Sequence, residues 1–94
     1  MTALPETLTL KEAPASLVGL RQAFLADASP VWRIDASPLR HLDSSAVAVL
    51  LECQRMAASQ QRRIEIVGAP TRLMELAHLY GVDTLIGAGS AGPP

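Results

Sequence analysis

The chain has little cysteine and little histidine, and these two shortages exclude whole classes of protein. Cys53 is the single cysteine among 94 residues, so an internal disulfide framework is excluded. The two histidines, His41 and His78, are far apart and make no recognisable zinc pattern with it. We therefore expect neither a bound metal nor a cofactor.

Basic residues are too few and too scattered for a nucleic-acid-binding surface. The chain has 8 Lys and Arg against 9 Asp and Glu, which gives a net charge of −1. Modules that bind nucleic acid usually carry a basic face that contacts phosphates. No nucleic-acid partner is expected, and the pair Arg62 and Arg63 is expected to lie in solvent.

Long apolar runs are also missing. A helix that spans a bilayer needs about 20 apolar residues, and no segment approaches that length. The first six residues lack the basic and then apolar order of a secretory signal peptide. The sequence thus favours a soluble, cytoplasmic protein without direct membrane insertion. Its 94 residues, 49% of them hydrophobic, are enough for one small domain with a single core.

Strands that alternate with helices are predicted from the spacing of the apolar residues. Strands are expected at Thr7–Leu10, Val31–Asp35, Arg63–Val67 and Thr84–Ile86. Helices are expected at Ala15–Ala26, at Ser45–Gln60 and, with Pro70 in its opening turn, after Gly68-Ala69. The third helix has a predicted buried stripe of Leu73, Leu76, Ala77 and Tyr80 and ends at Gly81, and Ala36–Leu42 is predicted to be a loop. This order predicts an α/β fold, with a small mixed sheet and helices packed against it.

The most informative segment runs from Asp43 to Ala46. It places a carboxylate and two hydroxyls where a helix begins, next to free backbone N–H groups and the positive end of the helix dipole. Ser44 is therefore either the capping residue or, if phosphorylated, a switch.

Catalysis is disfavoured by the residues around this segment. Asp35 and Asp43 could form a carboxylate pair, but the sequence places no third ligand or basic residue with them. The chain also lacks a nucleophile with a base, a glycine-rich phosphate loop and a metal cluster. We expect that it is not an enzyme.

Two short motifs connect the chain to a known family. Ile34-Asp35-Ala36-Ser37, followed by Leu42-Asp43-Ser44-Ser45-Ala46, resembles the STAS domain of bacterial anti-sigma factor antagonists and sulfate-transporter C-terminal domains. The similarity extends to Val67-Gly68-Ala69-Pro70. Residues 76–82 are most similar to the MlaB-type branch, a subunit of the phospholipid ABC transporter that maintains outer-membrane lipid asymmetry. The resemblance implies a STAS-like domain over residues 1–86. Residues 87–94 are rich in glycine and proline and are expected to form a flexible tail.

The resemblance also implies a function and a surface. In the MlaB-type case the chain is a regulatory subunit that binds the cytoplasmic ATPase and is recruited through it to the inner face of the inner membrane. The alternative is an anti-sigma factor antagonist, whose partner is a serine kinase that phosphorylates Ser44, the residue matching the phospho-acceptor position. The expected partner interface combines the start of the predicted second helix with the end of the third. Its residues are Asp43, Ser44, Ser45, Ala46, His78, Leu79 and Tyr80.

Overall fold

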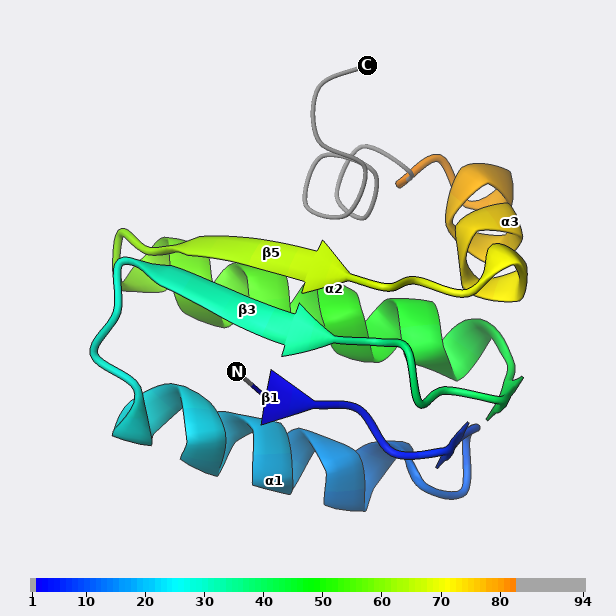
Figure 1. The fold of residues 1–94 in the computed structure, drawn as a ribbon, viewed down its shortest axis with the longest axis horizontal. Coiled ribbons are helices and arrows are strands. Elements are labelled where there is room, and N and C mark those ends of the chain that lie inside the picture. Colours follow the sequence, from blue (N-terminus) through cyan, green and yellow to red (C-terminus); the bar gives the residue numbers. More distant parts are fainter. Residues whose placement is uncertain (1, 83–94) are drawn as a thin grey trace.

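The computed structural model describes residues 2–82, which fold into helices and short strands in alternation (Figure 1). Their order is β1 (Thr2–Ala3), β2 (Thr7–Leu8), α1 (Ala13–Ala26), β3 (Val31–Asp35), β4 (His41–Leu42), α2 (Ser44–Ser59), β5 (Arg63–Val67) and α3 (Thr71–Leu79). The predicted strand Thr84–Ile86 and the predicted tail lie outside the described residues. None of the helices within residues 2–82 combines the length and apolar character that crossing a bilayer requires.

Parallel strand pairs organise the sheet. The order of the larger sheet is β1-β3-β5, and β2 pairs with β4 beside it. Two parallel neighbours must be joined by a crossover, and here α1 and α2 lie in the two crossovers of the larger sheet. Figure 1 shows α2 behind β3 and β5, with α1 alongside β1. The predicted α/β class, a small sheet with helices packed against it, is confirmed.

The core lies between the sheet and the two crossover helices. Trp32 and Ile34 of β3 and Ile66 of β5 are fully buried, and the Trp32 ring packs on Phe24 of α1 with ring centroids 4.9 Å apart. The alternate residue of β3, Arg33, is exposed on the other face, where its Nε donates to Glu65 at 2.7 Å. The period-two pattern of the strand thus separates core from solvent.

The N-terminal segment differs from its prediction. We expected one strand, Thr7–Leu10, before the first helix, but two two-residue strands precede it and belong to different sheets. The strand ends at Leu8 because the backbone N–H and the hydroxyl of Thr9 both donate to the Glu12 carboxylate, which closes a turn. Leu10 then stands in a turn with 75% of its surface exposed. The loop prediction was also wrong at His41–Leu42, which forms β4 against β2.

Arg62 is not the solvated residue that the sequence predicted. Its side chain is only 13% exposed, and its guanidinium lies 4.2 Å from the centroid of the Phe24 ring. Its Nε donates to the Ser29 carbonyl at 2.7 Å, and its Nη1 donates to the Phe24 carbonyl at 3.1 Å. A cation at the carbonyl end of α1 favourably opposes the helix dipole, so Arg62 fixes the end of that helix.

The third helix confirms its predicted stripe except at one residue. Leu73, Leu76 and Ala77 are buried, whereas Tyr80 is 55% exposed. Helix α3 ends at Leu79, and Gly81 adopts a φ of +72°, as expected for a glycine that terminates a helix. Tyr80 therefore lies beyond the last helical turn, where the stripe no longer faces the core.

Gly68 controls how closely the ends of β3 and β5 approach. Its φ is +68°, and a Cβ placed on it would lie 2.9 Å from Cβ of Ser37. Gly81 shares the positive φ, but no heavy atom of the described residues lies within 4 Å of its would-be Cβ. Substituting alanine at Gly81 therefore tests backbone strain alone, whereas the same substitution at Gly68 tests strain together with a steric clash.

We predict that Gly68→Ala destabilises the domain more than Gly81→Ala does. Gly81→Ala should cost roughly 1–2 kcal/mol, the penalty of the left-handed conformation, whereas Gly68→Ala adds the clash with Ser37. Gly19→Ala, in the open on α1, should instead stabilise by about 0.5–1 kcal/mol. Urea unfolding of the three variants measures the order. Equal losses at Gly68 and Gly81 would contradict a close approach at Gly68.

Candidate functional site

The start of α2 is fixed by Asp43 rather than by a serine. Asp43 is the N-cap residue, and its Oδ1 accepts a hydrogen bond from the Ser45 N–H at 2.8 Å. Its Oδ2 accepts a second hydrogen bond, from the Leu10 N–H at 3.2 Å. These bonds, chiefly the one from Ser45, hold the pKa of the Asp43 carboxyl below its usual value. The helix start therefore carries an ionised carboxylate that joins it to the turn before α1.

The three residues after the cap point in different directions. Ser44, the first residue of α2, is exposed, and Ser45 is partly buried. Ala46 is fully buried, so it has no surface to offer a partner and packs in the core beneath the site. Because Asp43 caps the helix, the hydroxyl of Ser44 is not needed for capping and faces solvent.

Ser44 and Tyr80, from distant parts of the sequence, line one surface hollow. The hollow has a volume of about 410 Å³. Its other lining residues are Val47, Ala48, Leu51 and Val82. Residues at spacings of three, four and seven from Ser44 share one side of α2, so helical spacing alone predicts part of this wall. The contribution of Val82 depends on the turn after α3 and has no such pattern.

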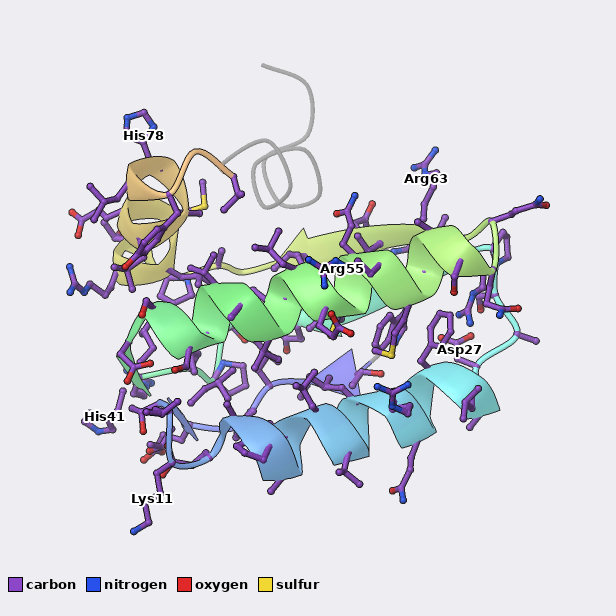
Figure 2. The ribbon with its side chains drawn as sticks, turned by 180° about the vertical axis from the view of Figure 1, so that it is seen from behind. Lys11, Asp27, His41, Arg55, Arg63 and His78 are labelled. Atoms are coloured by element: carbon purple, nitrogen blue, oxygen red, sulfur yellow. The ribbon has the colours of Figure 1, made fainter. Side chains whose placement is uncertain are left out.

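The other two residues expected at the end of α3 do not line the hollow. Leu79 is 74% exposed, and His78 projects from α3 on the side away from α2 (Figure 2). Leu79 adds an apolar side chain, and His78 a polar one, to the surface of α3 next to Tyr80. The structure thus brings Tyr80 to Ser44 and leaves His78 and Leu79 on an outer face of α3.

Other reactive groups are committed to structural contacts. The Asp35 carboxylate accepts a hydrogen bond from the Ser37 N–H at 3.0 Å, and contact with Ser37 lowers the pKa of Asp35. Burial raises the pKa of the Cys53 thiol to about 12, so the thiol is protonated and unreactive near neutral pH. Among residues 2–82 no group of three His, Cys, Asp or Glu side chains is placed to hold a metal ion. The hollow itself presents a hydroxyl beside apolar groups, which can contact and hydrogen-bond a partner.

The fold and this helix start together define the class of the protein. A small sheet of parallel strands, two helices in its crossovers and an Asp-Ser-Ser segment capping the second of them make up a STAS-like α/β domain. The family model described as the MlaB STAS domain matches residues 4–87. The chain belongs to this MlaB-type STAS domain family. STAS domains are generally regulatory or binding domains rather than enzymes.

Two further comparisons add nothing to this assignment. Neither a search of the curated proteins nor a search of the solved structures found a match to the chain.

We predict that Asp43→Ala lowers the melting temperature at neutral pH, since it removes both hydrogen bonds at the start of α2. A carboxylate with a lowered pKa stabilises the fold fully above the ordinary pKa of an unfolded aspartate, about 3.9, and this contribution disappears as the pH falls through the lowered value. The difference in melting temperature between the wild type and Asp43→Ala should therefore shrink below about pH 4. Thermal unfolding followed by circular dichroism measures it.

Asp43→Asn is the matched control for the two bonds. Its side-chain oxygen can still accept from the Ser45 N–H, but its NH₂ group cannot accept from the Leu10 N–H. This variant should lose less stability than Asp43→Ala and should speed amide hydrogen exchange at Leu10. An unchanged melting temperature for Asp43→Ala at pH 7 would show that the cap contributes nothing.

Proposed function

We propose that this chain is a non-enzymatic regulatory subunit that docks on the cytoplasmic ATPase of an Mla-type phospholipid ABC transporter, a system for outer-membrane lipid asymmetry. The observation that carries the proposal is the hollow shared by Ser44 and Tyr80 in a chain of the MlaB-type family. Through this contact the subunit is held at the inner face of the inner membrane, and residues 1–86 act as its binding domain.

The surface chemistry supports docking of a protein. The hollow combines exposed aromatic and aliphatic groups with a hydroxyl, and Tyr80 is a residue type that is frequent at the energetic centres of interfaces. Asp43 and Ser45 adjoin the hollow at the start of α2, and Leu79 and His78 lie next to Tyr80 on the outer face of α3. Such a subunit changes the activity of its partner only as far as it binds two states of that partner with different affinity.

The alternative is an anti-sigma factor antagonist switched by phosphorylation of Ser44. The exposure of that hydroxyl, which the Asp43 cap leaves free of a capping role, favours this second candidate. Its partner is a serine kinase, and the phosphate is the release signal.

The first test places bulk or charge in the hollow. Ser44→Leu and Ser44→Glu should each weaken binding to the ATPase by about tenfold or more at unchanged melting temperature, because a filled hollow or an unpaired carboxylate opposes docking. Gln54→Glu, at an exposed position about 15 Å further along α2 that does not line the hollow, is the control of equal charge change and should bind normally. Titration of the purified ATPase by calorimetry gives the affinities. Undiminished binding by both Ser44 variants would move the contact away from the hollow.

The second test separates the two partners. In the transporter case the ATPase-bound form carries an unmodified Ser44. In the antagonist case the chain isolated from cells contains a phosphorylated fraction that Ser44→Ala abolishes. Intact-mass spectrometry of the chain measures this fraction, and a stoichiometric phosphate at Ser44 would favour the antagonist.

A further inference from the structure

A second hollow, of about 440 Å³, lies next to the first on the flank of α2 that faces α1. The two helices run side by side, and the hollow between them forms an α1–α2 groove (Figure 2). Its apolar lining comes from Leu10, Ala13, Leu17, Ala48, Val49 and Leu51. Ala48 and Leu51 also line the hollow that contains Ser44, so the two depressions form one continuous surface across α2. Of the residues assigned to the interface from sequence, only Ser45 lines this groove, so the sequence did not predict that the surface continues toward α1.

Leu10 is held at the mouth of this groove although most of its side chain is exposed. Its exposed fraction is 75%, but its backbone is fixed by the bond from its N–H to Asp43. The preceding residue, Thr9, is tied to Glu12 by two hydrogen bonds. An apolar side chain on a fixed backbone loses little conformational freedom on binding, and burying it removes apolar surface from water. Leu10 is thus positioned as an anchor for a partner.

The walls of the groove favour a helix as its occupant. Both walls are helices, whose backbone N–H and C=O groups are already paired along their length, so they offer no edge to which an added strand could bond. A helix satisfies its own backbone groups and lays its apolar residues between the ridges of its neighbours. From Ser45 to Arg55, both of which line the groove, α2 rises about 15 Å, which matches roughly ten helical residues.

The charges of the groove favour an acidic occupant. Arg21, Glu52 and Arg55 line it, and Arg55 Nη1 bonds to Glu52 at 3.0 Å. Within residues 2–82 no ion pair involves Arg21, which is exposed. The groove therefore presents one positive charge in excess, and an acidic side chain beside Arg21 complements it.

We propose that the α1–α2 groove receives an amphipathic helix of the ATPase partner, with its apolar face on Leu10 and Leu17 and an acidic residue against Arg21. This inference rests on the proposed function and names the partner element and the second half of the docking surface. It places Leu10 and Arg21 in the interface beside the residues near Ser44.

The test compares two pairs of matched variants in calorimetric titrations with the purified ATPase subunit of an Mla-type phospholipid transporter from the same organism. Leu10→Gln is matched by Leu25→Gln, because Leu25 is also 75% exposed but does not line the groove. Arg21→Glu is matched by Arg63→Glu, an exposed arginine at the start of β5. We expect Leu10→Gln and Arg21→Glu to raise Kd by about tenfold and about fivefold, and the two controls to leave it unchanged. Arg21→Glu should also weaken the dependence of Kd on salt.

Each outcome separates the inference from the function on which it rests. Tight binding by the wild type with equal affinity for all four variants overturns the groove and leaves the proposed function standing. Equal losses for Leu10→Gln and Leu25→Gln also overturn it, because the effect is then not specific to the groove. No binding by the wild type overturns the proposed function, and the groove assignment falls with it. Equal melting temperatures of the variants exclude unfolding as the cause of a loss.

Discussion

The carboxylate of Asp43 is the interaction on which both candidate surfaces depend. One oxygen holds the first turn of α2 through Ser45, and the other holds the turn before α1 through Leu10. The hollow at Ser44 and the α1–α2 groove lie on adjacent flanks of the same helix and share Ala48 and Leu51, so a single residue at its start helps to fix the geometry of both. Because its hydrogen bonds lower the pKa of Asp43, the carboxylate is ionised at neutral pH and can accept both bonds.

The elements that the sequence predicted well are those whose pattern repeats over several residues. Strands β3 and β5 have the predicted bounds, and α2 is shifted by one residue at each end. In these elements the apolar residues that repeat along the sequence are also those that the core buries. Strands β1 and β4 were missed, because a segment of two residues has no period and forms only where a distant partner meets it, whereas β2 was predicted two residues too long. At Thr9 local chemistry prevailed over alternation: Thr-Leu-Lys-Glu, with its hydroxyl three residues before a carboxylate, is a turn and helix-start pattern. Arg62 was misjudged because the carbonyls that bury it belong to α1 and the following loop.

Only part of the candidate site, the start of α2, could be predicted from the local sequence. The Asp-Ser-Ser segment marks a helix start without any knowledge of the fold, but only the structure shows that Asp43, which accepts from the Ser45 N–H, is the residue that caps it. Tyr80 was predicted to be buried because it continues the stripe of α3 by seven residues. The helix ends one residue earlier, and the turn through Gly81 leaves the ring at the surface beside Ser44. Which side chains of α2 and α3 meet depends on how the two helices pack, and the spacing of residues within one helix cannot predict it.

The same geometry accounts for how a phosphate at Ser44 would act, whichever partner the surface binds. A phosphoserine carries about −1.5 to −2 charges at neutral pH, and here it would stand one residue from a carboxylate that is itself ionised. The backbone N–H of Ser45 already bonds to Asp43, so that donor is not free for the phosphate. The hollow beside it is lined mainly by Val47, Ala48, Leu51 and Val82, and closing a partner over two neighbouring anions there requires their desolvation. Modification at Ser44 therefore opposes docking through charge at the surface, while the fold beneath it stays intact.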